Sequence, residues 1–183
     1  MKTKWPISEA RSVGKILVYD LAPLCDRIEI AGSIRRKKPM VSDIEVLYVP
    51  RFVERPLDLL SNHMVSLADE KIPGWLATGL LAKRPSSTGV ITWGEKNKLG
   101  IHVPSGISVD FFATTLENWW VSLVIRTGSK YTNLALTNGA ITHGGSLQAY
   151  GSGVMKRGVL YQARSERDVF DLCGLDYLEP ENR

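Results

Sequence analysis

The sequence of 183 residues lacks the features of membrane, secreted and disulfide-rich proteins. No run of 18 or more apolar residues occurs, so hydropathy predicts no membrane-spanning helix. The amino terminus, MKTKWPISEARS, has no apolar stretch of the kind that a secretion signal contains. Only two cysteines are present, Cys25 and Cys173, and two isolated cysteines form no metal motif. We therefore expect an intracellular, soluble, cytoplasmic protein in which both cysteines are reduced core residues.

A large charge of one sign is also absent, as are internal repeats and low-complexity tracts. The 23 basic and 19 acidic residues leave a net charge of +4, which permits a nucleic-acid partner without requiring one. Hydrophobic residues make up 44% of the chain and charged residues 23%, as in an ordinary soluble globular protein. A chain of this length can bury a substantial core as one compact unit or as two small subdomains.

Apolar periodicity and turn residues predict an alternation of helices and strands along the chain. The expected helices are 8–24 with Ser8 as N-cap and Pro23 near its end, 56–71, 115–124 with Thr115 as N-cap, 131–138, and 165–174 with Ser165 as N-cap. The expected strands are 27–30, 44–49, 88–93, 99–103, 107–113 and 159–162, with a hairpin at 141–148.

Residues 31–49 carry the densest group of chemically significant side chains. A Gly-Ser pair, Gly32 and Ser33, precedes four consecutive basic residues at 35–38, and a strand bearing Asp43 and Glu45 follows. Residues two apart on a strand point to the same face, with Cα atoms roughly 6–7 Å apart. Two neighbouring carboxylates on an otherwise apolar strand repel each other and are costly to bury. The pair either lies at a solvent-facing edge or binds a divalent metal ion.

The residues before this pair favour the metal. A metal-bound triphosphate requires closely approaching backbone N–H groups, a hydroxyl and guanidinium counter-charge. Gly32, Ser33 and the basic residues at 35–38 supply these groups. A nucleotide-binding metal site is therefore predicted over residues 32–45.

The order Gly-Ser, basic loop and Asp-x-Glu resembles the signature of the nucleotidyltransferase superfamily. In particular, GSIRRKKPMVSDIEVL is similar to the palm of the family X DNA polymerases, the DNA polymerase β group. Asp110, in the strand expected at 107–113, matches the third carboxylate of that palm. Thr127, Gly128 and Ser129 with Asn133 match the family's TGS…N motif. The segment SERDVFDLCGLDYLEPENR resembles its carboxy-terminal end, so the resemblance covers essentially the entire chain.

The resemblance implies an α+β fold in two parts. Residues 1–115 would form a nucleotidyltransferase palm, with a mixed or antiparallel sheet and helices on one side. Residues 116–183 would form a small α/β carboxy-terminal subdomain that binds nucleotide and DNA. The helix-hairpin-helix segments and the amino-terminal lyase domain of larger members are not expected here, although minimal viral members have the same two-subdomain size.

The resemblance also implies two-metal-ion catalysis with Mg²⁺, for which Mn²⁺ can substitute. Asp43 and Glu45 would bridge the ions, and Asp110 would bind the ion that activates the primer 3′-hydroxyl and receive its proton. The remaining expected contacts are to the nucleotide from Gly32, Ser33, Arg36, Thr127, Gly128, Ser129 and Asn133, and to DNA from Lys37, Lys38, Lys130, Lys156 and Arg157.

The sequence departs from the family pattern at positions that handle the sugar and the template. Ile125 and Arg126 stand where the family often has two aromatic residues. Thr137 replaces an arginine that touches the template in many members. The strand bearing the third carboxylate has Ser108 and Phe112 where relatives have arginines. We therefore expect intact palm chemistry with weak template discrimination.

The predicted function is template-directed DNA synthesis at short gaps, as in DNA repair. The partners would be deoxynucleoside triphosphates and a primer-template or gapped DNA, without a membrane, and the protein would be a monomer. A non-templated nucleotidyltransferase acting on RNA, a nucleotide or a protein is one alternative, against which the complete carboxy-terminal part argues. A non-catalytic nucleic-acid-binding module is the other, and the intact Asp43, Glu45 and Asp110 argue against it.

Overall fold

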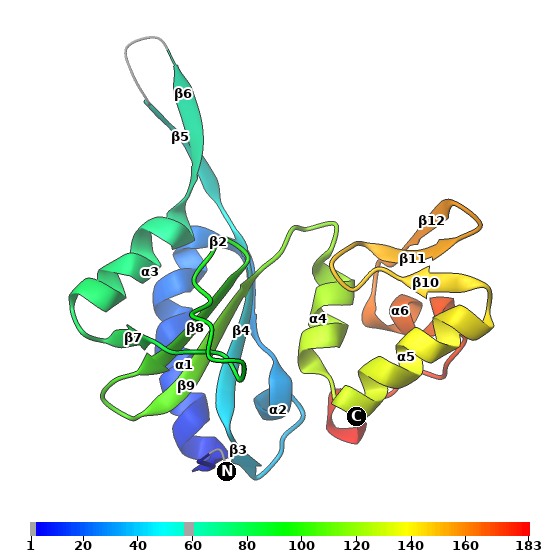
Figure 1. Cartoon of the computed structure of the whole chain (residues 1–183), viewed down its shortest axis with the longest axis horizontal. Helices are drawn as coiled ribbons and strands as arrows, with labels where there is room; N and C mark the ends of the chain where they lie inside the picture. The colour runs from blue at the N-terminus through cyan, green and yellow to red at the C-terminus, as the bar shows by residue number, and fades with distance from the viewer. Residues whose placement is uncertain (1–2, 57–60) are drawn as a thin grey trace.

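The computed structural model describes residues 3–56 and 61–183 (Figure 1). It is an α+β structure in which a lobe built on a mixed sheet is followed by a smaller lobe of helices and short strands. Within the described ranges, no helix has the length and hydrophobicity of a membrane span.

A five-stranded sheet forms the centre of the first lobe, in the order β2-β4-β9-β8-β7. Its strands are β2 (Cys25–Ile30), β4 (Asp43–Pro50), β7 (Leu81–Lys83), β8 (Asn97–His102) and β9 (Ile107–Ala113). Strands β4 and β9 are parallel and the other neighbours are antiparallel, so the sheet is mixed. The strands predicted at 27–30, 44–49, 99–103 and 107–113 are confirmed within two residues at each end.

Two helices cover one face of this sheet, α1 (Ile7–Leu21) and α3 (Leu67–Ala77). Their apolar faces share one core with the alternate residues of β4 and β9 that point the same way, namely Ala10, Leu17, Leu21, Ile44, Val46, Tyr48, Ala68, Ile72, Trp75, Val109 and Phe111. The opposite face of β4 and β9 therefore carries the other set of side chains, including the acidic ones.

The start of α1 differs from its prediction. Ser8 is not the N-cap, because the helix begins at Ile7 after the short strand β1 (Trp5–Pro6), which pairs with β3 (Met40–Val41). The amide of Ile7 donates to the carbonyl of Pro39. The predicted stop near Pro23 is confirmed, since the α-helix gives way to the 3₁₀ helix η1 (Ala22–Leu24).

The prediction of a helix at 56–71 is wrong for residue 56 and for residues 62–66, and it holds from residue 67 onward. Strands β5 (Phe52–Pro56) and β6 (Asn62–Ser66) form an antiparallel hairpin that projects from the lobe, while residues 57–60 lie outside the described residues (Figure 1). The helix α3 begins only at Leu67, where the Ser66 side chain accepts a hydrogen bond from the Asp69 amide at 3.1 Å. Ser66 is therefore the N-cap that the periodicity alone did not identify.

The strand predicted at 88–93 is also wrong. Residues 84–96 form a connection between β7 and β8 that has only two isolated bridges, Pro85 to Ile91 and Trp93 to Lys98. The alternation of apolar residues there does not reflect a buried strand face, because Val90 and Ile91 are exposed.

The second lobe contains α4 (Trp119–Thr127), α5 (Lys130–Thr142), α6 (Glu166–Leu172), the 3₁₀ helix η2 (Pro180–Asn182) and a three-stranded sheet of β10 (Gly145–Leu147), β11 (Gly153–Lys156) and β12 (Val159–Gln162). Thr115 does not cap α4, whose N-cap is Asn118. The strand at 159–162 and the Ser165 cap of α6 are confirmed, with the Asp168 amide donating to the Ser165 hydroxyl at 3.0 Å.

The predicted end of α5 at residue 138 is wrong, because the helix passes through Gly139 and this glycine serves packing instead of ending the helix. A side chain at Gly139 would place its Cβ 2.3 Å from the carbonyl oxygen of Cys173. The glycine thus permits close contact with the segment after α6, and the helix continues to Thr142. The hairpin predicted at 141–148 consequently lies further along, between β10 and β11.

Helix α4 packs on the sheet face opposite α1 and α3. Trp119 and Leu123 of α4 share a small core with Leu47, Val49 and Phe112 of β4 and β9. This core covers the carboxyl ends of the two strands. The residues that precede it on the same face, at the other end of β4, are Asp43 and Glu45.

Candidate active site

Three carboxylates gather on the face of the sheet that α4 leaves uncovered. In the parallel pairing of β4 and β9, Glu45 is the register partner of Asp110, and Asp43 pairs with Ser108. Alternation along each strand places Asp43, Glu45 and Asp110 on one face. The sequence motif and the isolated aspartate are thus brought together, although strands β5, β6, β7 and β8 and helix α3 separate them along the chain.

Burial and the two neighbouring carboxylates make ionisation of the Glu45 carboxyl unfavourable. Burial raises the pKa of its carboxyl to about 7, with further contributions from the negative charges of Asp43 and Asp110, while Arg126 and Arg36 act in the opposite direction. A bound cation would relieve both the burial and the repulsion. Gly32 makes room for this side chain, because a Cβ there would lie 1.8 Å from Glu45 Oε2.

The metal-free protein is expected to lose stability as the pH rises from about 4.5 to about 7. In this window Glu45 retains a proton in the folded state that the unfolded chain releases, so the unfolded state binds fewer protons and rising pH favours it. Thermal melting in the presence of a chelator should show this decline, and Glu45→Gln should flatten it. Glu54→Gln, at an exposed position on β5, is the control that should keep the wild-type slope.

The donor set fits a hard divalent cation, since all three side chains offer carboxylate oxygens of the kind that Mg²⁺ prefers. Among the described residues, however, no group of three or more His, Cys, Asp or Glu side chains is arranged as a complete metal site. Asp110 instead forms an ion pair with Arg84, whose Nη2 lies 2.5 Å from Oδ1 and 2.6 Å from Oδ2. The sequence did not identify this arginine.

The Gly-Ser turn opens the short helix α2 (Gly32–Arg35) beside the carboxylates. The Ser33 hydroxyl is buried and has no hydrogen-bond partner in the structure. Arg36 follows α2 and donates from Nη1 to the carbonyl of Thr127, while its Nε is also buried without a partner. Burial lowers the pKa of Arg36, against the opposing charges of Glu45 and Asp43. Such orphaned donors suit an anionic oxygen ligand.

A cavity of about 380 Å³ lies between these groups and the second lobe. It is lined by Arg36, Glu45, Ile125, Arg126, Gly128, Ser129, Lys130 and Asn133. Four of the predicted nucleotide contacts therefore line one cavity, namely Arg36, Gly128, Ser129 and Asn133. Gly32, Ser33 and Thr127 do not line it.

Asn133 is held so that one end of its amide is available. Its Nδ2 donates to the carbonyl of Ile125 at 2.8 Å, and its Oδ1 is buried without a hydrogen-bond partner. Ser129 caps α5, because its side chain accepts from the amide of Thr132. Thr127 is fully buried, and its hydroxyl accepts a hydrogen bond from Arg35 at 3.0 Å. Thr127 therefore has a structural partner, which the motif did not reveal.

The residues predicted to contact DNA are spread over three elements. Lys37 and Lys38 are exposed in the loop after α2, where Lys37 pairs with Glu181 at 3.0 Å. Lys130 lies at the start of α5 and lines the cavity. Lys156 and Arg157 lie at the turn between β11 and β12.

Replacing Arg36 with alanine should lower kcat/KM for the nucleotide by about 10–100-fold, because charge-assisted hydrogen bonds contribute about 1.5–3 kcal/mol. Lys38→Ala should change it by no more than about threefold and act mainly through the salt dependence of DNA binding. Steady-state kinetics at varied nucleotide and salt concentrations distinguish the two. Equal effects of both variants would indicate a diffuse basic patch and no specific phosphate contact.

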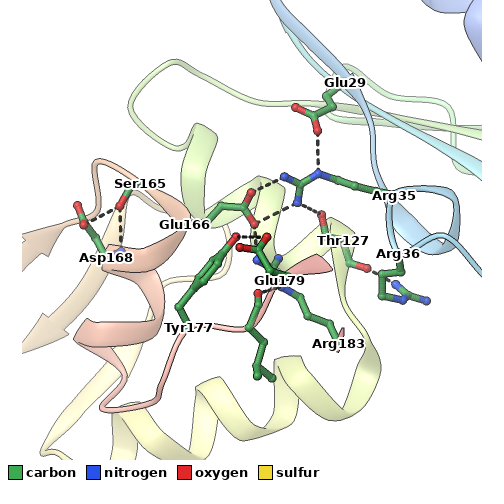
Figure 2. Close-up of polar contacts among 11 residues, drawn as sticks. Glu29, Arg35, Arg36, Thr127, Ser165, Glu166, Asp168, Tyr177, Glu179 and Arg183 are labelled. Carbon is green, nitrogen blue, oxygen red and sulfur yellow. Dashed lines mark hydrogen bonds and ion pairs between the residues drawn. The ribbon is translucent and has the colours of Figure 1, made fainter. Parts of the chain in front are cut away.

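An ion-pair network that the sequence did not predict links α2 to the carboxy terminus (Figure 2). Arg35 lies 2.7 Å from Glu29 through Nε, and its Nη1 and Nη2 both contact Glu166 at the start of α6. The side chain of Arg183, fully buried, reaches Glu166 Oε2 at 2.6 Å. Burial alone would raise the pKa of Glu166, but its contacts with Arg35 and Arg183 hold that pKa below its usual range. The network joins the two lobes beside the site.

Arg126 packs against two aromatic rings, a contact that the sequence did not predict. Its guanidinium carbon lies 3.6 Å from the centroid of the Phe112 ring and 6.0 Å from that of Tyr150. An arginine and an aromatic ring thus meet at the positions where the sequence pattern departs from the family it resembles. This contact places a positive charge beside Glu45.

Comparisons with known proteins found similar sequences and similar folds. A family model described as DNA polymerase beta thumb matches residues 122–183. The DNA polymerase/3'-5' exonuclease PolX of Bacillus subtilis (strain 168) is 24% identical over 183 residues, which cover 98% of this chain and 28% of that protein. The chain thus spans less than a third of the length of this curated relative.

Solved structures show the same fold. The ternary P/T complex of Leishmania infantum polymerase beta superposes with a TM-score of 0.73 at 23% identity, over 99% of this chain and 77% of that one. The ternary gap complex of the same polymerase has a TM-score of 0.73 at 21% identity, over 99% of this chain and 71% of that one.

Proposed function

We propose that this chain is a member of family X of the DNA polymerases, the group of DNA polymerase β, and that it fills short gaps as a template-directed DNA polymerase. The observation that supports this most is the register of Glu45 with Asp110 on parallel strands, next to the cavity lined by Arg36, Gly128 and Asn133. The solved relatives are complexes described as P/T and gap complexes, which suits a primer end at a gap as the substrate here.

The chemistry follows from the carboxylate face. Two Mg²⁺ ions, or Mn²⁺, would stabilise the attacking and leaving oxygens of the displacement. Asp43 and Glu45 would hold both ions, and Asp110 would hold the one near the primer 3′-hydroxyl. The Asp110 carboxylate, or a water beside it, would receive the hydroxyl proton. Catalysis of this kind depends chiefly on positioning and charge neutralisation.

The second set of residues would hold the incoming deoxynucleotide. The orphaned Ser33 hydroxyl and the Arg36 guanidinium would contact the β- and γ-phosphates. Gly128 and Ser129 would lie along the sugar and triphosphate, with Thr127 supporting them through Arg35. The available Oδ1 of Asn133 would face the base edge.

We assign residues 1–115 to a palm and residues 116–183 to a subdomain that binds nucleotide and DNA. Phosphates of the DNA would be contacted by the basic loop and by the second lobe, through Lys37, Lys38, Lys130, Lys156 and Arg157. Because these residues lie on separate elements and are few, affinity should be modest and should fall as the salt concentration rises. The protein would act as a monomer.

Primer extension on three substrates tests the proposal: a duplex with a one-nucleotide gap, a single-stranded DNA and an RNA of matched sequence. The proposal predicts the fastest addition at the gap, with Mg²⁺ or Mn²⁺ present and none in a chelator. Equal addition to single strands would contradict gap filling. Loss of addition on all three substrates, with nucleotide binding retained, would favour a non-catalytic binding module.

One observation supports non-templated addition as the second candidate. Thr137 is exposed on α5, and its hydroxyl donates to the carbonyl of Asn133 at 2.9 Å. The side chain is thus short, uncharged and bonded to its own helix, so it offers no cation to a template strand. Addition to single strands at the rate seen for gaps would establish this alternative.

A further inference from the structure

The ion pair between Arg84 and Asp110 is placed at the carboxylate that the proposed chemistry needs most. Both side chains are largely enclosed, with 13% and 11% of their surfaces exposed. One nitrogen, Nη2, makes the contact to both carboxylate oxygens, at 2.5 and 2.6 Å. Nη1 donates to the carbonyl of Pro85 at 3.2 Å, and Nε is buried without a hydrogen-bond partner.

The backbone fixes this contact across three strands. Arg84 directly follows β7, and its amide donates to the carbonyl of Leu99 on β8 at 3.0 Å. Leu99 is in turn the register partner of Asp110 on β9. Arg84, Leu99 and Asp110 therefore lie in one row across the sheet, and the Arg84 side chain reaches over β8 to the carboxylate. The strand of Asp110 supplies no arginine of its own at the neighbouring positions of this face, which are Ser108 and Phe112.

A single cation nearly equidistant from both oxygens of a carboxylate has the position that a chelated metal ion takes. We propose that Arg84 is an internal counter-cation for Asp110, which competes with the divalent ion for that carboxylate and must withdraw before the ion binds. The inference rests on the proposed function in one respect, in taking Asp110 as a ligand of that ion. Arg84 is accordingly a positioning residue that acts through Asp110.

An opposite role is physically possible for such a neighbour. A residue that hydrogen-bonds a metal ligand commonly orients it, and its loss then weakens metal binding by about 10–100-fold. The geometry favours competition, since an orienting arginine would leave the region between the two oxygens open, whereas Nη2 occupies it. The two roles predict changes of opposite sign when the charge is removed.

Binding of Mn²⁺ alone, without nucleotide or DNA, tests the inference by titration calorimetry or by the electron paramagnetic resonance of the free ion. Arg84→Gln should bind Mn²⁺ about tenfold more tightly than the wild type, within the range usual for coupled ligands. Arg84→Lys keeps one cationic nitrogen near Asp110 and should retain affinity close to that of the wild type. Arg55→Gln is the matched control, because it removes an ion-paired arginine on β5 and should change nothing.

The outcomes separate this inference from the proposed function. Weaker or unchanged Mn²⁺ binding by Arg84→Gln overturns it, provided that circular dichroism shows a folded protein. If Arg84→Gln fails to fold, Arg84→Met removes the charge with an apolar stem of similar length; it too should bind Mn²⁺ about tenfold more tightly than the wild type, and weaker or unchanged binding overturns the inference. Asp110→Asn should weaken Mn²⁺ binding, and if it does not, the assignment of Asp110 as a ligand fails as well.

Discussion

Replacing Asp110 with alanine is expected to lower the rate of nucleotidyl transfer by about 1,000-fold or more. A divalent ion held by this carboxylate would contribute several kcal/mol of charge stabilisation, and about 4 kcal/mol corresponds to about 1,000-fold in rate. Nucleotide binding should be largely retained, because Asp43 and Glu45 lie on the other strand and still face the cavity side of the sheet. Single-turnover incorporation at a gap, together with a nucleotide-binding titration, measures both quantities.

The control for this variant is Ser108→Ala, two residues earlier on the same strand and face, which should transfer nucleotides at the wild-type rate. Replacing Asp43 and Glu45 together should weaken metal-dependent nucleotide binding as well as transfer. If Asp110→Ala retained turnover near that of the wild type, the assignment of three catalytic carboxylates would be wrong.

The substitution Glu166→Gln is expected to destabilise the protein by about 3–5 kcal/mol, the loss usual when one partner of a buried ion pair is removed. It would leave Arg35 and the fully buried side chain of Arg183 without their shared counter-charge. Arg183 has few alternatives, since its Nε donates to the carbonyl of Leu178 and its guanidinium lies over the rings of Phe170 and Tyr177. Chemical denaturation measures the change.

Glu181→Gln is the matched control for that substitution. Glu181, close to the carboxy terminus, forms an ion pair with Lys37 in the loop after α2, but both of these side chains are exposed. An exposed pair of this kind contributes little to stability, because water screens its charges. Equal destabilisation by the two variants would contradict the view that the buried network joins the two lobes.

The carboxylate pair of β4 could be predicted from the sequence because Asp43 and Glu45 are two residues apart on an apolar strand, whose period of two places them on one face. Asp110 was assigned through the family resemblance, and its register with Glu45 across β4 and β9 required the structure. The cap of α6 at Ser165 was equally readable, since its partner is three residues away. Local chemistry and short spacing carried both predictions.

Elements that depend on distant partners were not readable. The spacing of apolar residues over 56–71 matched a helix, but residues 62–66 pair as β6 with β5, in the register of Phe52 with Ser66, and the helix begins only at Leu67. Gly139 looked like a helix end, whereas its lack of a side chain serves the contact with Cys173. In both places tertiary packing outweighed the local pattern.

The charged contacts of the site could not be predicted from the sequence either, because their partners are also distant along the chain. Arg84 and Asp110 are 26 residues apart, and Arg35 and Glu166 are 131 apart. Nothing in the local sequence of either arginine indicates its partner. Arg126 could be recognised as a departure from the family pattern, but its position over Phe112 required the structure.

Incorporation of a single nucleotide at a one-nucleotide gap, opposite each of the four template bases and with each deoxynucleotide, tests the central claim most directly. The account predicts that the complementary nucleotide is preferred, with weak discrimination because Thr137 offers no charged contact to the template. A mismatch then costs about 1–3 kcal/mol, or about 10–200-fold. Addition that is the same opposite every template base would contradict templated synthesis by this site.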